Sequence, residues 1–202
     1  MSRYIFVIDA DRCIGCKGCQ VACKAENGIG PGENRNRVFD VGPTGVFPDL
    51  EMYFLPVMCQ QCEEPACVAA CPTKACRRNE ADAVVMIDAE TCIACRACER
   101  ACPYGALTLN RERRVMDKCT ICEQLRREGE KPACVKNCPG NALYCGDIDD
   151  PDSAVSQLLA QTRPEHIHKL RDTGSHPGNY YILRNAAWQD LLPRELAERR
   201  GG

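Results

Sequence analysis

Short strand-like segments recur along the chain, and each leads into a group of cysteines. Residues 4–8 (Tyr-Ile-Phe-Val-Ile) are rich in β-branched and aromatic side chains, and residues 84–88 and 113–117 hold the same place before later cysteines. Residues 52–57 form a fourth segment, in which Pro56 restricts the strand to a sheet edge or a bulge. We therefore predict a repeated unit of a strand, a cysteine loop and a short helix entered at the last cysteines.

Two cysteine-free intervals interrupt this repeat. Residues 28–49 contain eight glycines and prolines, which predicts an inserted surface loop that covers the cysteine region, contacts a partner or is simply solvated. The interval from 123 to 133 predicts a short polar helix that Gly129 and Pro132 end.

Beyond Gly146 the chain contains no cysteine. Asp150 as N-cap, Pro151 in the first turn and the apolar spacing that follows predict a helix. Residues 180–183 (Tyr-Tyr-Ile-Leu) predict a strand or an extended arm. We interpret residues 151–202 as a C-terminal helix and a tail that wraps around the body or docks onto another subunit, with a frayed end over the last few residues.

The composition leaves little for a conventional interior. Hydrophobic residues make up 45% of the chain, but this share includes 18 cysteines. Without cysteine the share falls to about 36%, below that of an ordinary globular domain. Aromatic residues are only 5%, so an aromatic core does not compensate. Bonds between thiolates and metal are the natural replacement.

The cysteines are expected to be metal ligands and not disulfides. Residues 1–8 have too short an apolar run, and no cleavage pattern, for a secretory leader. No apolar run approaches the roughly 18 residues of a membrane span. We therefore expect synthesis as a soluble chain in a reducing compartment, where grouped cysteines bind metal.

Sixteen of the 18 cysteines form four runs of four. Runs one and three have the spacing C-x-x-C-x-x-C-x-x-x-C, whereas the middle gap is four residues in run two and eleven in run four. In bacterial ferredoxins such a run holds one 4Fe–4S cluster with three thiolates and lends the fourth to a second cluster. The four runs therefore supply the ligands of four clusters. They are Cys13, Cys16, Cys19 and Cys23; Cys59, Cys62, Cys67 and Cys71; Cys92, Cys95, Cys98 and Cys102; and Cys119, Cys122, Cys134 and Cys138.

The formal net charge of −2 counts every cysteine as neutral. Four clusters held by thiolates would add about −8. Basic residues beside the ligands are expected to offset part of this charge and to raise the cluster potentials, or to form an exposed charged face. These residues are Arg12, Lys17, Lys24, Arg96, Arg100, Lys118 and Lys136.

No other chemistry competes with the cysteine runs. Residues 28–32 are rich in glycine but lack the strand and helix of a dinucleotide site. His166, His168 and His176 lie outside every run and are expected at the surface. A structural zinc protein is the alternative from another class, because sixteen cysteines could hold four zinc ions. Zinc sites do not require the fourth cysteine followed by proline, and a zinc protein is colourless where an iron–sulfur protein is brown.

Spacing alone leaves two ways of pairing the runs. Either runs two and three pair and leave run one to run four, or the runs pair in sequence. The long interval after Cys23 disfavours the sequential choice.

The runs resemble those of the iron–sulfur electron-transfer subunits of the dimethyl sulfoxide reductase family. The resemblance rests on the order of the runs, the longer second and fourth runs and residues 101–106 (Ala-Cys-Pro-Tyr-Gly-Ala), and it covers residues 4 to about 150. It implies the nested pairing. The implied ligands are Cys13, Cys16, Cys19 and Cys138 for cluster A; Cys23, Cys119, Cys122 and Cys134 for cluster B; Cys71, Cys92, Cys95 and Cys98 for cluster C; and Cys59, Cys62, Cys67 and Cys102 for cluster D.

The repeat and the resemblance together predict an α+β fold of two ferredoxin-like, two-cluster modules, built from pseudo-repeated βαβ-type units around 4Fe–4S clusters, with a C-terminal wrapping tail. Residues 1–27 and 113–150 would form the first module and residues 50–112 the second, with 28–49 as the inserted loop. Lys24 departs from the ferredoxin pattern, which has proline after the fourth cysteine. Ligation stays intact, but we expect a different backbone turn there.

The resemblance implies an electron-transfer subunit that is not itself catalytic. Clusters with four cysteine ligands have no open coordination site and pass single electrons. The expected partners are a molybdenum- or tungsten-bis(pyranopterin) catalytic subunit and a quinone-linked membrane subunit or another redox carrier, with neither nucleic acid nor membrane insertion of this chain. A free polyferredoxin that serves several enzymes is the alternative, which co-purification with a pterin subunit would exclude.

The expected location follows from the same resemblance. We expect synthesis in the cytoplasm, followed by residence there or by export to the periplasmic or membrane side together with the catalytic subunit. Cys76 and Cys145 fall outside the runs and are expected to be small buried residues packed beside clusters, with a redox-active thiol as the functional alternative.

Overall fold

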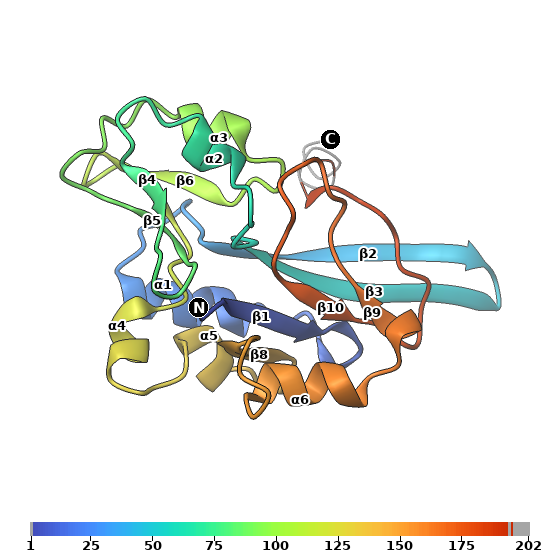
Figure 1. Ribbon diagram of the computed structural model, residues 1–202. Coiled ribbons are helices and arrows are strands. Elements are labelled where there is room, and N and C mark those ends of the chain that lie inside the picture. Colours follow the sequence, from blue (N-terminus) through green and yellow to red (C-terminus); the bar gives the residue numbers. More distant parts are fainter. Residues whose placement is uncertain (1, 194, 196–202) are drawn as a thin grey trace.

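The computed structural model describes residues 2–193 and residue 195, and short strands and helices alternate along it (Figure 1). The strands are β1 (Tyr4–Asp9), β2 (Asn36–Val46), β3 (Asp49–Met58), β4 (Cys76–Arg78), β5 (Val85–Ile87), β6 (Leu107–Asn110), β7 (Val115–Lys118), β8 (Leu143–Asp147), β9 (Ile167–His168) and β10 (Tyr180–Ile182). The helices are α1 (Gly18–Asn27), α2 (Ala66–Ala69), α3 (Ala97–Ala101), α4 (Glu123–Arg127), α5 (Ala133–Lys136) and α6 (Ala154–Gln161), with 3-10 turns η1 (Ala10–Arg12) and η2 (Pro164–His166).

A four-stranded sheet brings distant parts of the chain together. Its order is β8-β1-β10-β9, with β1 antiparallel to β8 and parallel to β10. Tyr4 lies opposite Asp147, and Val7 opposite Tyr180. The strand before run one is thereby paired with the strand after run four. The pairs β2–β3, β4–β5 and β6–β7 are antiparallel and two-stranded.

The predicted repeat of strand, cysteine loop and short helix is present. Strands β1, β3, β5 and β7 precede the four runs, and helices α1, α2, α3 and α5 carry later cysteines of each run. Helix α1 packs against α5, and α2 against α3. Helix α4 is the polar helix that was predicted between the second and third cysteines of run four.

Helix α1 is longer than its counterparts because Lys24 replaces proline. It spans 10 residues, whereas α2, α3 and α5 span four or five. Proline disfavours helical backbone in the residue before it, which here is the last cysteine of each other run. Without it, α1 continues to Asn27, and Lys24 Nζ donates to the carbonyl oxygens of Gly30, at 2.9 Å, and Glu33. The expected difference in the turn is confirmed.

The prediction of a surface loop over residues 28–49 is wrong for its second half. Residues 36–46 form β2, which pairs with β3 in a long hairpin. Glycine and proline in this stretch mark a register shift and the turn, and do not mark a loop. Gly42 has φ of 107°, and a Cβ there would lie 2.7 Å from the carbonyl oxygen of Glu51. Only glycine fits this point of close approach.

The C-terminal helix begins later than predicted. Helix α6 starts at Ala154, and its N-cap is Ser153, whose Oγ accepts a hydrogen bond from the Ser156 amide at 3.2 Å. Asp150 and Pro151 instead form the turn before the helix, where the Asp150 carboxylate accepts a backbone hydrogen bond.

The described part of the C-terminal tail wraps onto the body. The predicted strand at residues 180–182 is β10, and Tyr181 and Ile182 are fully buried in it (0% exposed). Arg184 Nη1 lies 3.1 Å from the Asp9 carboxylate at the end of β1. The predicted frayed end falls on residues outside the described part. Among the described helices, none has the length and apolar character needed to cross a bilayer.

The interior is shared by apolar side chains and cysteines. Phe6, Leu55 and Tyr104 are at most 2% exposed and pack in one core with buried cysteines, including Cys59 and Cys134. Cysteine positions thus take the place of part of the missing apolar side chains.

Candidate metal centres

Runs one and three share one backbone trace. In run one, the residues on either side of the second cysteine, Gly15 and Lys17, have φ of 67° and 59°. The equivalent residues of run three, Ala94 and Arg96, have φ of 54° and 61°. Left-handed residues placed in this way turn backbone N–H groups to one side and form a concave nest for an anionic group, as in many iron–sulfur sites.

Runs two and four also contain residues with positive φ, but at other positions of the run. Gln61 has φ of 48°, and Ile121 and Cys122 have φ of 55° and 45°. Ile121 is fully buried (0% exposed), and a β-branched residue with positive φ is a rare conformation. Backbone strain of this kind persists only where the surrounding structure fixes it, and it is concentrated at functional sites.

Backbone amides donate to cysteine sulfurs in every run. Such donors favour thiolate over thiol and raise the potential of a bound cluster. At Cys71 they outweigh burial, which alone raises the pKa, so that the pKa of this thiol is lowered. The N–H···Sγ distances are 3.5 Å from Gly18 to Cys16, 3.4 Å from Cys76 to Cys71, 3.5 Å from Met116 to Cys92, 3.4 Å from Ile121 to Cys119 and 3.3 Å from Ala142 to Cys138.

Cysteines of runs one and four influence one another through space. Burial, followed by the charges of Cys13, Cys138 and Cys16, raises the pKa of Cys19 to about 11. Cys138 is the last cysteine of run four, so the end of this run lies close to run one.

A second mixed group joins the same two runs. Burial and the charges of Cys119, Cys122 and Cys23 raise the pKa of Cys134 well above its usual value. Cys23 is here the residue from run one.

Cysteines of runs two and three also affect one another's pKa, which places these two runs close together. Burial raises the pKa of Cys102 to about 11, with contributions from the charges of Cys59 and Cys67. Burial, with Cys67, Cys71 and Cys92, raises that of Cys98 to about 11.

These buried cysteine groups need a nearby positive charge before their thiols can become thiolates. Buried thiols with raised pKa values stay protonated near neutral pH, yet only thiolates ligate metal. Iron would supply the missing positive charge, and the nests and amide donors suit an anionic iron–sulfur cluster. Among residues 2–193 and 195, no three histidine, cysteine, aspartate or glutamate side chains are grouped closely enough to hold a single metal ion.

Asn27 is a site residue that sequence reasoning missed. Its Nδ2 lies 3.7 Å from Cys23 Sγ and 4.0 Å from Cys122 Sγ. Asn27 stands one helical turn after Cys23, which places both on one face of α1. Lys24 was the available signal, because without proline the helix extends far enough to bring Asn27 to the sulfurs.

The two cysteines outside the runs lie next to cysteines of the runs. Cys76 is 2% exposed, its backbone amide donates to Cys71 Sγ, and its side chain, together with burial, raises the pKa of Cys67. Burial and the charges of Cys119 and Cys122 raise the pKa of Cys145. Burial beside cysteine groups, as predicted, is confirmed for Cys76, whereas Cys145 as a whole residue is half-buried.

The histidines lie in the tail, as their positions in the sequence indicated. His168 is half-buried and stacks on Trp188 with 4.9 Å between ring centroids. His166 is also half-buried, so the expected surface position holds fully only for His176, which is exposed and pairs with Asp172 at 2.7 Å.

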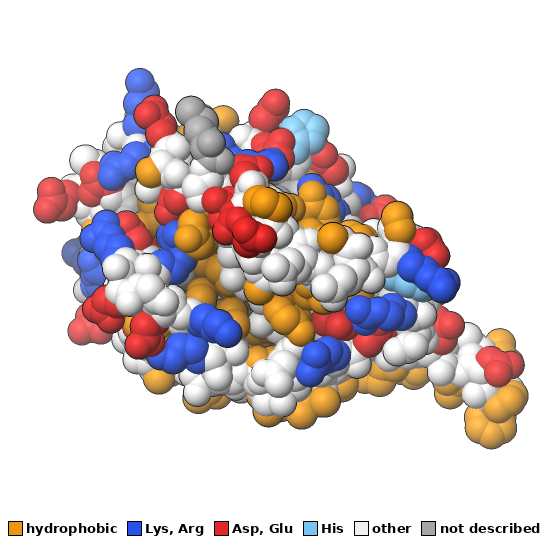
Figure 2. Space-filling model, turned by 60° about the horizontal axis from the view of Figure 1, so that its bottom comes forward, with side chains coloured by type: hydrophobic (Ala, Val, Ile, Leu, Met, Phe, Trp, Pro, Cys, Tyr) orange, Lys and Arg blue, Asp and Glu red, His pale blue; other side chains and the backbone are white. Residues whose placement is uncertain are grey.

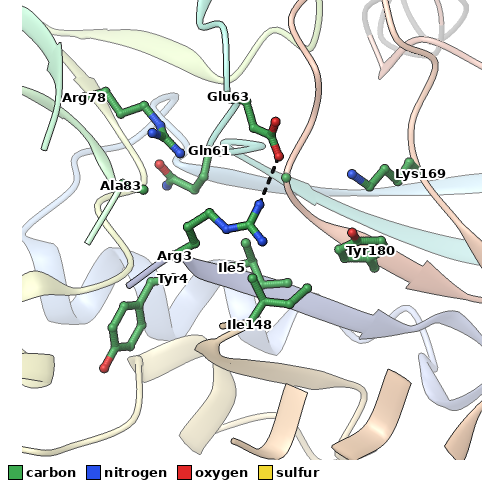
Figure 3. A pocket seen from close by; sticks show the side chains of 11 residues that line it. Arg3, Tyr4, Ile5, Gln61, Glu63, Arg78, Ala83, Ile148, Lys169 and Tyr180 are labelled. Carbon is green, nitrogen blue, oxygen red and sulfur yellow. Dashed lines mark hydrogen bonds and ion pairs between the residues drawn. The ribbon is translucent and has the colours of Figure 1, made fainter. Parts of the chain in front are cut away.

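A small cavity between the sheet and the run-two loop is not a cysteine site. Its lining includes Arg3, Gln61, Arg78 and Lys169, and Arg3 forms an ion pair of 3.2 Å with Glu63 (Figure 3). Its volume of about 20 Å³ suffices for a water molecule.

Nests, amide-bonded cysteines and mixed cysteine groups define an iron–sulfur protein of the ferredoxin type. Residues 50–148 match the family model described as 4Fe-4S dicluster domain, and residues 4–25 match that of 4Fe-4S binding domain.

Known proteins carry the identification further. The chain is 38% identical to a putative iron-sulfur subunit of a dimethyl sulfoxide reductase from Halobacterium salinarum, over 90% of this chain and 79% of that protein. It is 36% identical to a sulfite dehydrogenase subunit from Allochromatium vinosum, over 97% and 89%, and 38% identical to a tetrathionate reductase subunit from Salmonella typhimurium, over 89% and 72%. The chain belongs to the iron–sulfur electron-transfer subunits of the dimethyl sulfoxide reductase family, whose 4Fe–4S clusters it shares.

Proposed function

We propose that the chain holds four 4Fe–4S clusters in the nested arrangement, with clusters A and B between runs one and four and clusters C and D between runs two and three. Two sets of observations support this pairing. Helix α1 packs on α5 and α2 on α3, so the helices that carry the cysteines meet in the nested combination. The charges that act on Cys19, Cys134, Cys98 and Cys102 come mainly from the same combinations.

The clusters form a wire in the order A, B, D, C. Cys19 of cluster A and Cys23 of cluster B are one turn apart on α1, and the charge of Cys19 acts on Cys23. The charge of Cys59, a ligand of cluster D, acts on Cys119 of cluster B. The charge of Cys67, also of cluster D, acts on Cys98 of cluster C.

The wire opens to the surface at its two ends. Cys16 of cluster A and Cys95 of cluster C are exposed. Ile14 and Ile93, which hold equivalent places in the two loops, are both 63% exposed. An apolar side chain beside an exposed ligand suits a contact that excludes water where an electron crosses between proteins.

One end would face a molybdenum- or tungsten-pterin catalytic subunit, and the other a quinone-linked membrane subunit or another carrier. The names of the relatives, which include a sulfite dehydrogenase and a tetrathionate reductase, concern different substrates. Substrate choice therefore lies in the catalytic subunit. The clusters supply single-electron chemistry, while the chain excludes water, fixes their spacing and sets their potentials through amide donors and charge.

The observation that carries the proposal is that Cys13, Cys16 and Cys19 of run one line one small cavity together with Cys138 of run four. Anaerobic isolation from native cells tests it. We expect about sixteen irons per chain, several paramagnetic signals on reduction and a pterin subunit in the same complex. Zinc in colourless protein would refute the proposal, and a brown chain that is isolated without a pterin subunit would favour the free polyferredoxin.

A further inference from the structure

The end of the β2–β3 hairpin exposes apolar side chains to solvent. Every residue from Gly42 to Met52 is exposed, and Val46 and Phe47 are 81% and 84% exposed. The hairpin projects beyond the rest of the fold (Figure 1). Hydrophobic side chains gather at its tip (Figure 2). Apolar side chains grouped on a protrusion mark an interaction site.

We call residues 42–52 the arm, and the arm is held firmly at its base. Just below it, Val41 and Leu55 are at most 2% exposed. The C-terminal tail braces one side, because Ala187 N donates to Glu51 Oε2 at 2.7 Å and Gln189 N donates to the Tyr53 hydroxyl at 3.1 Å. A braced arm loses little conformational freedom on binding.

The position of the arm points to the partner at cluster A. The Phe54 ring, at the base of the arm, contacts Gly15 in the run-one loop, which contains the exposed Cys16. A protein seated on the arm therefore also faces the cluster A end of the wire.

The negative charge of the arm favours binding to a protein over binding to a membrane. Asp49 and Glu51 are its charged residues, and it contains neither lysine nor arginine. Anionic lipid headgroups attract basic segments and repel acidic ones.

We propose that residues 42–52 are the docking arm for the pterin catalytic subunit, which receives the tip in an apolar socket with a basic rim. The inference rests on the proposed function, which supplies the pterin subunit as one of the two partners, and it adds that this subunit sits at the cluster A end. Aromatic side chains at protruding positions are frequent anchors of interfaces, and Phe47 holds that place here.

The test compares Val46→Asp/Phe47→Glu with Ala160→Glu, which adds an acidic group at an exposed position of α6. Each full-length chain is purified with its clusters and titrated with the pterin subunit isolated from native cells. We expect the double variant to raise Kd at least about tenfold with iron content unchanged, and the control to bind like the parent.

Unchanged affinity of the double variant overturns the docking arm but leaves the proposed function standing. Failure of the parent chain to bind the pterin subunit contradicts the proposed function itself. Two further assays use vesicles of phosphatidylethanolamine and phosphatidylglycerol, and light scattering of the chain alone. If the double variant loses vesicle binding but keeps its affinity for the pterin subunit, the arm binds a membrane. If it loses a dimer and keeps that affinity, the arm binds a second copy of the chain. Either result would overturn the proposal.

A buried lysine supports a second inference independently. Lys118, at the end of β7, is 1% exposed, and its Nζ donates to the carbonyl oxygens of Cys119, at 2.8 Å, and Val85. Among the described residues no carboxylate forms an ion pair with it. A buried charge without a counter-charge is costly, so the anionic partner is a group that the chain alone does not supply.

Lys118 faces ligands of two clusters. The neighbouring Cys76 side chain and burial raise the pKa of Cys67, a ligand of cluster D, and the Lys118 ammonium opposes the rise. Burial raises the pKa of Cys119, a ligand of cluster B, to about 12, and Lys118 opposes this rise as well.

Hydrogen bonds fix the ammonium in this place. Val85 N donates to Gln61 Oε1 at 2.8 Å, and Gln61 Nε2 donates to the carbonyl of Cys119 at 3.3 Å. Lys118 bonds to the same two residues and closes a ring between the run-two loop, β5 and the run-four loop.

We infer that Lys118 is a positioning residue that raises the potentials of clusters B and D and so sets the middle hop of the wire. The inference rests on the proposed function, which places these clusters next to each other. A nearby positive charge stabilises the reduced cluster, which carries one more negative charge.

Redox titration of the holo-protein, followed by paramagnetic resonance, tests this inference. We expect Lys118→Met to shift two cluster signals to lower potential and to leave the other two in place, with Lys118→Arg closer to the parent. Gln61→Glu, which adds negative charge to the same ring, should lower the same two potentials even if Lys118→Met does not fold. Lys169→Met removes an exposed charge of the C-terminal tail, outside every cysteine run, and serves as the control.

Four unchanged potentials, or a uniform shift of all four, would overturn the role of Lys118. Fewer than four signals in the parent would instead contradict the proposed function.

Discussion

The ring of Phe54 lies against Gly15, so that a Cβ at Gly15 would be 2.5 Å from Phe54 Cε1. Gly15 has φ of 67°, and Ala94, at the same place in run three, has φ of 54°. Since Ala94 carries a side chain in this conformation, the contact with Phe54 and not the backbone angle requires glycine in run one.

Gly15→Ala is therefore expected to destabilise the holo-protein by about 1–3 kcal/mol through overpacking. In Gly15→Ala/Phe54→Ala the two changes should cost less than their sum, with a coupling of about 1 kcal/mol or more. Chemical unfolding under anaerobic conditions measures both, and Ala94→Gly is the matched control. Strictly additive effects would show that the contact does not decide the identity of residue 15.

The ion pair of Arg35 and Asp117 spans 2.8 Å and is largely buried, with side chains 11% and 16% exposed. Arg35→Met leaves the Asp117 carboxylate without its partner and is expected to cost about 3 kcal/mol, whereas Arg35→Met/Asp117→Asn should be milder. Arg127→Met breaks an exposed pair with Glu123 and should cost less than about 1 kcal/mol. The unfolding free energies of the three variants check the order, and equal losses for both pairs would contradict it.

Lys24→Pro should shorten helix α1. Proline restricts Cys23, removes the amide of residue 24 and costs roughly 3 kcal/mol inside a helix. Asn27 is then no longer held beside Cys23 Sγ and Cys122 Sγ, so the potential of cluster B should fall as well. Redox titration separates this effect from lost stability. Lys24→Arg, which keeps both the helix and the charge, should leave the potential of cluster B close to that of the parent.

The nested pairing predicts which variants share a spectroscopic effect. Cys13→Ser and Cys138→Ser should alter the same paramagnetic signal although 125 positions separate them in sequence. Cys23→Ser should alter a different signal, shared with Cys122→Ser. Under sequential pairing, the variant of Cys138 would instead affect a signal shared with run three.

Removal of the clusters should unfold the chain. The core contains cysteines together with apolar side chains, and metal binding to such sites is part of the folding free energy. Oxidative removal of iron under a chelator is expected to abolish the cooperative thermal transition that far-UV circular dichroism detects. An apo-chain that kept this transition would show that apolar packing alone is sufficient.

The strands, short helices and ligand loops could be predicted because their signals are local. The short spacing between cysteines predicts a tight loop that brings their sulfurs together. Residues with high β propensity precede this loop in every run. The hairpin at residues 36–58 was obscured because Gly42, Pro43 and Gly45 mark a register shift within paired strands as readily as a loop. Its pairing depends on contacts with the body, which local patterns do not contain.

The missed parts of the site depend on distance in sequence. Lys118 could be recognised as a basic residue beside a ligand, but its burial follows from β5 and the run-two loop closing over it. Asn27 reaches Cys122 from 95 positions away. Such contacts become visible only when the elements are placed in space.

Strand β10 gives the chain an order of assembly. It lies between β1 and β9, parallel to β1, and Val7 is paired with Tyr180. During synthesis, β1 is made first and keeps one edge open until residues 180–182 have emerged from the ribosome. The run-one loop, which follows β1 directly, thus gains its final support only after residues 180–182 have been made, when all four cysteine runs already exist.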